Sequence, residues 1–237
     1  MQSLKNLALS NHDCVPRASM TFARRLASRL LRHGNRTPLE YWENRVRMYG
    51  ARSVLNIAHA QENMAEITRM QEQEIFPHFR SQLNGTEKVI LDFGCGPGRF
   101  TPQLAGLICG KAIGIDPMRE LLREAPSSPD VSYECVRCSR LPFADGSMDA
   151  IWCCLVLGGI AEPTETISEL CRVLRSDGLV FLVENTSDQP DGKYWKYRSV
   201  EQYISLFDFA KLIHLHDYSD VGERISVMAG RKTASLL

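Results

Sequence analysis

The sequence predicts an α/β protein with a doubly wound sheet of seven strands, mostly parallel with the last strand antiparallel, preceded by N-terminal helices. From Val89 onward, short apolar runs of strand length alternate with segments of helical character. A glycine-rich turn joins the first run to the first helix, and the last two runs follow one another with no helix between them. Five βα units imply parallel strands, and a final pair joined directly implies an antiparallel strand.

Length and composition limit the possible functions. The chain has 237 residues, enough for one well-buried α/β domain plus an appendage. Its 28 Lys and Arg residues balance 28 Asp and Glu residues, so no overall positive charge recruits nucleic acid. No apolar stretch approaches the roughly 18 residues of a membrane span, and the start lacks a secretory signal pattern. Eight cysteines, mostly within apolar runs, indicate free thiols in a reducing compartment, so we expect a cytoplasmic protein.

Residues 1–37 form a basic leader, in which Asp13 is the only acidic residue. Three interpretations remain open. The segment is a partly ordered leader or surface helix, a helix that contacts a membrane surface or an anionic partner, or an Arg-rich organelle transit segment. The basic residues are Lys5, Arg17, Arg24, Arg25, Arg29, Arg32 and Arg36.

Residues 38–85 are predicted to be helical. Thr37 is a suitable N-cap, Pro38 suits the first helical position, and Glu40 completes a capping box. A second helix is predicted from about Gln61 to Leu83, with an approximate apolar stripe and a proline, Pro77, inside it.

The glycine-rich turn follows the first predicted strand, Val89–Leu91. Gly94, Gly96 and Gly98 occupy alternate positions after Asp92, and a helix follows. Glycine is needed at such a junction because a Cβ would keep the backbone away from a ligand. The sequence therefore predicts a ligand-binding loop between the first strand and the first helix.

Asp116 ends the second predicted strand, about twenty residues after the glycine turn. A carboxylate at this point is where a ribose diol is bound in nucleotide-binding sheets. The dinucleotide fingerprint G-x-G-x-x-G requires a glycine where this chain has Arg99, which disfavours a nicotinamide oxidoreductase.

The remaining elements of residues 86–237 follow from the same patterns. A continuous apolar run at 151–156 is typical of a central strand buried on both faces. The predicted helices are 101–110, 118–125 and 164–174, and residues 206–212 continue the fold. The predicted strands are 111–116, 131–136, 148–157, 179–183, 213–218 and 225–229.

At this point the sequence resembles the class I S-adenosylmethionine-dependent methyltransferases, and within them the type 11 group. The run Asp92–Gly98 resembles the family's first motif and Ile115–Pro117 its second. Leu141–Asp149 is similar to the element before the fourth strand, and Arg172–Gly178 is similar to the turn before the fifth. The resemblance covers residues 86–232, which would form the cofactor-binding core, with residues 38–85 as a helical lid.

The resemblance implies a cofactor, S-adenosyl-L-methionine, which would leave as S-adenosyl-L-homocysteine. Two departures from the family pattern stand out. Arg137 replaces the acidic residue that commonly accepts from the adenine amino group, and Gly158 with Gly159 replaces polar residues after the fourth strand. The residues that would contact the cofactor are Asp92, Gly94, Cys95, Gly96, Gly98, Asp116, Pro117, Met118, Cys138, Ser139 and Cys153, the last through its main chain.

Substrate and base candidates come from the strand-end loops and the lid. Tyr194, Trp195 and Arg198 follow the fifth strand and are predicted either to contact a flat, sugar-like or anionic substrate or to pack the lid, as are Tyr41 and Trp42. Glu184 ends the fifth strand and is the first candidate for a general base, and His59 is the second. His214 with His216, and the pair Cys135 and Cys138, lack the further ligands that a metal site needs, so no metal is predicted.

Three functions remain open. The first is methylation of a small molecule or glycan, with an oxygen acceptor favoured over nitrogen or carbon. The second is methylation of RNA or a nucleoprotein, although no Asn-Pro-Pro-Tyr-type motif follows the fourth strand. The third is a methyltransferase-like protein that binds without catalysis.

Overall fold

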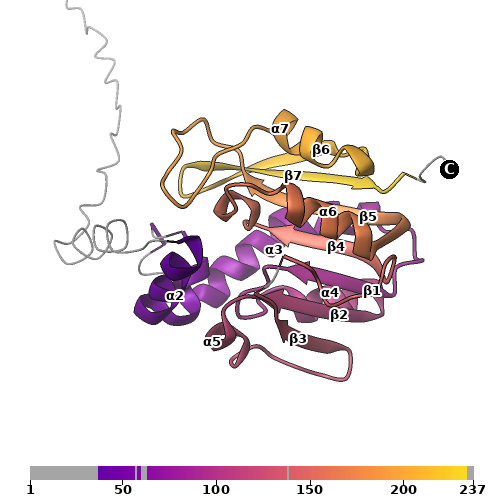
Figure 1. Cartoon of the computed structure of the whole chain (residues 1–237), viewed down its shortest axis with the longest axis horizontal. Coiled ribbons are helices and arrows are strands. Elements are labelled where there is room, and N and C mark those ends of the chain that lie inside the picture. Colours follow the sequence, from indigo (N-terminus) through magenta and orange to yellow (C-terminus); the bar gives the residue numbers. More distant parts are fainter. Residues whose placement is uncertain (1–36, 57, 60–62, 138, 234–237) are drawn as a thin grey trace, which may run out of the picture. The chain divides into compact units, whose positions relative to one another are not determined.

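One compact unit comprises residues 35–237, and within it a seven-stranded sheet has the order β3-β2-β1-β4-β5-β7-β6 (Figure 1). This computed structural model describes residues 37–56, 58–59, 63–137 and 139–233. The predicted basic leader lies outside the described residues. The strands are β1 (Val89–Phe93), β2 (Lys111–Asp116), β3 (Val131–Cys135), β4 (Met148–Cys154), β5 (Leu174–Asn185), β6 (Ile213–Asp220) and β7 (Glu223–Arg231).

The predicted sheet is confirmed. Strands β1 to β5 pair in parallel, and β7 pairs antiparallel with both β5 and β6. The helical elements are α2 (Pro38–Tyr49), η1 (Gly50–Val54), α3 (Met64–Gln82), α4 (Thr101–Ile108), α5 (Arg119–Leu122), η2 (Leu157–Gly159), α6 (Thr164–Val173), α7 (Val200–Leu206) and η3 (Asp208–Ala210). Helix α3 continues through Pro77.

Two hydrophobic cores cover the two faces of the sheet. Successive strand residues point to opposite faces, so Ile90 and Leu91 of β1 enter different cores. Helices α3 and α4 pack on the Ile90 face, where Phe79 and Phe181 meet the buried indole of Trp152. Helices α6 and α7 pack on the Leu91 face. The chain therefore forms three layers, helix on sheet on helix.

Helix α2 starts as the sequence predicts. Thr37 Oγ1 accepts the N–H of Glu40, and the carboxylate of Glu40 accepts the N–H of Thr37, both at 3.1 Å. Arg45, a buried residue of α2, donates to the carbonyls of Ser53 and Leu55 at 2.5 and 2.7 Å. Because Ser53 lies within η1 and Leu55 follows it directly, Arg45 fixes η1 against α2. Both segments lie near the carboxyl-terminal ends of the central strands (Figure 1).

The prediction of five βα units was wrong in one place. The described part of the connection between β3 and β4, residues 136–137 and 139–147, contains no helix. Arg172 of α6 instead donates to the carbonyls of Leu141 and Phe143, at 3.0 and 2.8 Å, so these groups are satisfied by a side chain. The predicted helix 118–125 is also shorter, as the four-residue α5.

The first predicted helix also ends differently. Cys109, with φ of 47°, takes the left-handed position at the end of α4, one residue before Gly110. In β6, an irregular register between His214 and His216 separates the two histidines. His214 pairs with Asp217, and His216 stacks on His78, so the two imidazoles have different partners.

Candidate active site at the carboxyl ends of the central strands

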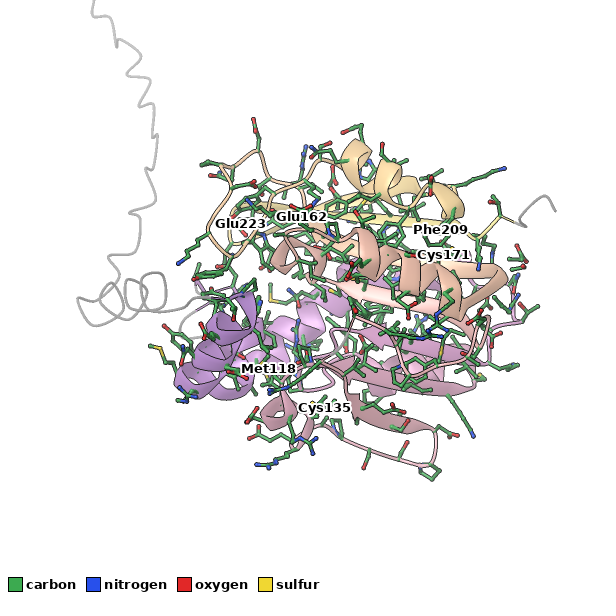
Figure 2. The ribbon with its side chains drawn as sticks, in the orientation of Figure 1. Met118, Cys135, Glu162, Cys171, Phe209 and Glu223 are labelled. Carbon is green, nitrogen blue, oxygen red and sulfur yellow. The ribbon has the colours of Figure 1, made fainter. Side chains whose placement is uncertain are left out.

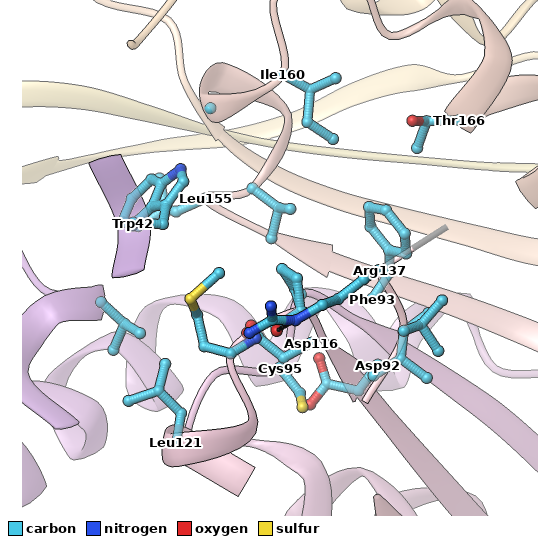
Figure 3. A pocket seen from close by; sticks show the side chains of 18 of the residues that line it. Trp42, Asp92, Phe93, Cys95, Asp116, Leu121, Arg137, Leu155, Ile160 and Thr166 are labelled. Atoms are coloured by element: carbon cyan, nitrogen blue, oxygen red, sulfur yellow. Dashed lines mark hydrogen bonds between the residues drawn. The ribbon is translucent and has the colours of Figure 1, made fainter. Parts of the chain in front are cut away.

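A cavity of about 340 Å³ lies over the glycine-rich loop. The carboxyl ends of β1, β2 and β4 form its floor, and α2 with η1 contributes Trp42, Val46 and Val54 to its lining. Asp92 and Cys95 lie on one side of it and Ile160 and Thr166 on the opposite side (Figure 3). Open α/β sheets bind ligands at this edge, and the volume falls within the range of small-molecule sites.

The glycine-rich loop approaches its neighbours too closely for side chains. Gly94, Gly96 and Gly98 all have positive φ, at 73°, 56° and 73°. A Cβ on Gly94 would lie 2.5 Å from Val156, and one on Gly96 would lie 2.8 Å from Val54. The loop therefore needs glycine both for its backbone conformation and for space.

Asp116 holds this loop in place. Its two carboxylate oxygens accept the N–H groups of Gly96 and Met118, at 3.0 and 2.8 Å. Burial raises the pKa of Asp116, and these two hydrogen bonds oppose the rise. Each carboxylate oxygen keeps a second lone pair, so Asp116, which lines the cavity, can accept two further hydroxyl groups there.

Asp92 is the second acid in the cavity wall. Its side chain is buried and accepts the hydroxyl of Thr101 at 2.6 Å. Burial raises the pKa of Asp92 to about 7, while the Thr101 hydroxyl and the charge of Arg99 oppose the rise. A cation bound beside Asp92 would favour its ionised form.

The β2–β3 side of the cavity is mostly apolar. Met118, Leu121 and Leu141 are buried there, and Ser139 joins them. Met118 lies at the same end of the sheet as Cys135 (Figure 2). Cys138, the neighbouring residue predicted to contact the cofactor, lies outside the described residues.

Arg137 replaces the expected acid on this side and joins three elements. Its Nε donates to the carbonyl of Pro117 at 2.9 Å, and its Nη1 lies 3.1 Å from the carboxylate of Glu43 in α2. Arg137 also lines the cavity and points toward Asp116 in the close view (Figure 3). The arginine therefore links the second strand end to α2.

The opposite wall is the turn after β4, which contributes Leu155, Val156, Gly159 and Ile160. Leu155 has a φ of 58°, which is uncommon for a branched residue. A Cβ on Gly159 would lie 3.3 Å from the indole of Trp42, so this glycine allows Trp42 to reach the cavity.

Glu184, predicted as a base, does not line the cavity. It is fully buried, and Oε1 accepts the N–H groups of Val156 and Leu157 at 3.0 and 2.8 Å. Burial raises its pKa to about 7, and the hydrogen bonds from the Leu157, Val156 and Gly158 main chain oppose the rise. The Glu184 side chain holds the main chain of the turn after β4 from outside the cavity. Its position therefore does not favour the predicted role as a general base.

The side chain of Cys153 points away from the cavity, toward Glu184, at 3.7 Å between sulfur and Oε1, and the contact of its main chain with the cofactor stays a prediction. Successive residues of β4 face opposite sides, so the cavity is lined by Cys154 instead. Strand alternation alone could have shown that only one of the two cysteines reaches the cavity.

His59, the second base candidate, is also absent from the lining. Its Nε2 lies 2.6 Å from Asp220 Oδ1, and Asp220 Oδ2 accepts from Gln71 at 3.1 Å. The histidine therefore joins the segment before α3 to the end of β6. Of the described residues, no group of three His, Cys, Asp or Glu side chains is arranged to hold a metal.

Of the five predicted substrate residues, only Trp42 lines the cavity. Tyr41 stacks on Tyr194 with ring centroids 4.5 Å apart, which joins α2 to the loop after β5. Trp195 lies against Gly158, and Arg198 donates to the carbonyls of Leu157, Ile160 and Ala161, each at 2.9 Å. The contacts of these four side chains join α2 to the loop after β5, and that loop to the turn after β4.

Comparison with known proteins finds a domain match and similar folds for this chain. Residues 91–182 match the family model of the methyltransferase domain. Among solved structures, a putative sarcosine dimethylglycine methyltransferase from Galdieria sulphuraria has a TM-score of 0.61 at 14% identity, covering 73% of this chain and 89% of that one. At this identity the likeness shows the fold alone.

Two curated relatives match less than half of the sequence. The human thiol S-methyltransferase TMT1B is 29% identical over 49% of this chain and 50% of its own length. The O-methyltransferase cnsE of Penicillium expansum is 28% identical over 43% of this chain and 39% of its own. The chain thus spans half or less of the length of these relatives. Residues 91–182 therefore carry a methyltransferase domain, and the seven-stranded sheet that contains them has the fold of the solved methyltransferase structure.

No helix in the described part of the chain combines the length and the apolar character needed to cross a membrane.

Proposed function

We propose that this protein transfers the methyl group of S-adenosyl-L-methionine to a small molecule, with oxygen as the first candidate acceptor atom. The observation that carries the proposal is Asp116, which lies in the cavity wall and fixes Gly96 and Met118 by hydrogen bonds. The Asp116 carboxylate thus holds the main chain of the glycine loop, and its remaining lone pairs would accept hydrogen bonds from the ribose hydroxyls.

The residues that line the cavity are chemically suited to each part of the cofactor. Asp116 would accept from the ribose hydroxyls, and Met118, Leu121 and Leu141 offer an apolar surface for adenine. Asp92 would pair with the methionyl ammonium group. Glycine lets the loop come close to Val54 and Val156, two other residues that line the cavity. When bound, the cofactor supplies a methyl group already activated on a sulfonium, so the protein's contribution is mainly positioning.

Among the described residues that line the cavity, none is an obvious general base for the methyl acceptor. Among the described lining residues, the carboxyl groups are Asp92, Asp116 and Glu169. The first two belong to the cofactor cradle. Glu169 is bound to Arg172, whose hydrogen bond lowers the pKa of Glu169 to about 2, making it a weak base. This observation favours, as a second candidate, a thiol acceptor, since a thiol with a pKa of about 8.5 is partly ionised without help.

The first test is binding and turnover. Titration calorimetry should show that the chain binds S-adenosylmethionine, and D116N should weaken binding by roughly 10- to 100-fold because charge-assisted hydrogen bonds are lost. D130N, at an exposed aspartate between β2 and β3, is the matched control and should bind as the wild type does. Absence of cofactor binding by the folded wild type would remove the proposal.

The acceptor is tested by parallel assays on phenols, glycans, aliphatic thiols and RNA. Faster turnover of thiols than of phenols at neutral pH would favour the second candidate over the first. Affinity for RNA that falls steeply with salt would favour the nucleic-acid alternative. Cofactor binding without turnover on any acceptor would favour a non-catalytic binding protein.

A further inference from the structure

The wall of the cavity that faces the cofactor cradle is apolar. It is built from α2 and from the turn after β4, and its side chains include Trp42, Leu155 and Ile160. In the close view these three lie on the side away from Asp92 and Asp116 (Figure 3). Among the described lining residues, none that α2, η1 or this turn contributes is charged. The whole cavity, about 340 Å³, is near the low end of the range for small-molecule sites.

Neighbouring side chains fix the position of Trp42 in this wall. Its indole packs edge-on against the ring of Tyr41, with centroids 5.3 Å apart, and the guanidinium carbon of Arg45 lies 5.5 Å from its centroid. A Cβ on Gly159 would lie 3.3 Å from the indole, so the turn after β4 comes close to it. Tyr41 in turn stacks on Tyr194 of the loop after β5. The indole is therefore a preformed aromatic surface at the border of the cavity.

The cations that line the described cavity, Arg99 and Arg137, are bonded to other groups. Nη1 of Arg99 donates to Thr68 Oγ1 at 3.1 Å and to Gln71 Oε1 at 2.9 Å, both on α3. Arg137 pairs with Glu43 at 3.1 Å. Arg99 follows β1 and Arg137 follows β3, so neither belongs to the wall formed by α2 and the turn. An anion against that wall would lose its hydration with no opposite charge there to replace it.

The polar groups near this wall also offer nothing to a positive charge. Thr166 of α6 lines the cavity on the same side as Ile160 (Figure 3). Glu169 of the same helix, the lining acid outside the cradle, is paired with Arg172 at 2.7 Å and accepts the N–H of Leu141 at 2.8 Å. Its charge is therefore already neutralised. The hydroxyl of Thr166 can hydrogen-bond an uncharged ligand, and it cannot neutralise a charged one.

We propose that the methyl acceptor is a small, uncharged molecule with an apolar aryl or alkyl body that packs against the indole of Trp42, which determines this specificity. The inference rests on the proposed function and deepens it, because it names the substrate class. A sugar would leave most of its hydroxyl groups without partners at this wall. In the transfer, the acceptor's oxygen or sulfur gains the methyl group, the sulfonium of the cofactor becomes a thioether, and the acceptor's proton passes to water.

The experiment measures the binding of matched probes by calorimetry to the full chain saturated with S-adenosylhomocysteine, so that no methyl transfer occurs. Para-cresol is compared with para-hydroxybenzoate, an anion, and para-ethylphenol with tyramine, a cation. Butanethiol and mercaptopropionate repeat the anion comparison for a sulfur acceptor. The wild type should bind each uncharged probe roughly 10- to 100-fold more tightly than its charged counterpart, because an unpaired charge is costly to desolvate. Turnover with S-adenosylmethionine should follow the same order.

W42L tests the role of the indole. It should weaken the binding of para-cresol by roughly tenfold, and W42F, which keeps an aromatic ring, should bind para-cresol more tightly than W42L does. Y49L is the matched control, because Tyr49 is an aromatic residue of the same helix α2 that does not line the cavity. It should bind para-cresol as the wild type does. Thermal unfolding and S-adenosylhomocysteine binding should show that each variant is folded.

Equal or tighter binding of the charged probes overturns the assignment of an uncharged acceptor. Unchanged binding of para-cresol by W42L overturns the role of Trp42. The charge comparison needs no variant, so it decides the inference even where W42L does not fold. If the folded wild type binds neither S-adenosylmethionine nor S-adenosylhomocysteine, the proposed function fails, and the inference fails with it. If it binds the cofactor and none of the uncharged probes, only the inference fails.

Discussion

Two walls of the same cavity reach their shape by different means. The glycine loop after β1 uses three glycines at positive φ, with Asp116 holding its main chain. The turn after β4 also contains a positive φ, but at Leu155, where the side chain gives no such freedom. A left-handed residue other than glycine costs about 1–2 kcal/mol.

The second wall is held by contacts from distant segments. Glu184 accepts two N–H groups of the turn from beneath, and Arg198 donates to three of its carbonyls from the other side. Lys196 N donates to Gly158 O at 2.7 Å, and Trp195 packs on the same glycine. The conformation of the first wall therefore depends on local residue types, and the conformation of the second depends on tertiary contacts.

The largest effect is expected where the two walls meet, at Gly94 and Val156. G94A places a Cβ at positive φ and 2.5 Å from Val156, so strain and overpacking together should cost about 2–5 kcal/mol. Cofactor affinity, measured by calorimetry, should fall by more than about tenfold. If the new Cβ clashes with Val156, the double variant G94A/V156A should regain part of the lost affinity. If it regains none, the whole cost comes from the backbone conformation at position 94.

The second prediction concerns the pH dependence that Glu184 gives the turn. Its pKa rises from 4.5 unfolded to about 7 folded, so the folded state binds the proton more tightly. Its stabilising contribution is complete below pH 4.5 and is lost as pH rises toward 7, by up to about 3 kcal/mol. Denaturant unfolding of E184Q should therefore show a shallower fall in stability across this window.

Burial also raises the pKa of Asp92 to about 7, and Asp92 is present in both the wild type and E184Q. The effect of Glu184 is therefore measured as the difference in the free energy of unfolding between E184Q and the wild type. That difference should grow in favour of E184Q from pH 4.5 to 7. Parallel stability curves would show that Glu184 keeps an ordinary pKa and that the turn does not depend on its protonation.

The smallest effect is expected at Gly158. G158A should displace the indole of Trp195 and cost about 1–3 kcal/mol, seen as faster proteolysis of residues 186–199 and altered tryptophan fluorescence. G106A, at an exposed position of α4 with open space around it, is the control and should be neutral or stabilising by about 0.5–1 kcal/mol. Equal behaviour of the two variants would mean that Trp195 does not need the glycine.

Most of the cofactor cradle could be predicted because its parts are close in sequence or follow a periodic pattern. The glycine loop, Asp116 and Met118 come together through one β-α-β connection, and Gly94, Asp116 and Met118 line the cavity. Arg99 was noted only as a missing glycine, since its partners Thr68 and Gln71 lie about thirty residues earlier.

The sequence by itself determined the seven-stranded sheet, the capping box of α2 and the loop from Asp92 to Gly98, because side-chain periodicity and the special freedom of glycine act locally. Only the tertiary structure decided that Glu184 turns beneath the β4 turn, that Cys154 replaces Cys153 in the lining, and that Arg198 binds carbonyls. The direction of a side chain at a strand end depends on which backbone groups nearby lack partners, and that is settled when distant segments pack together.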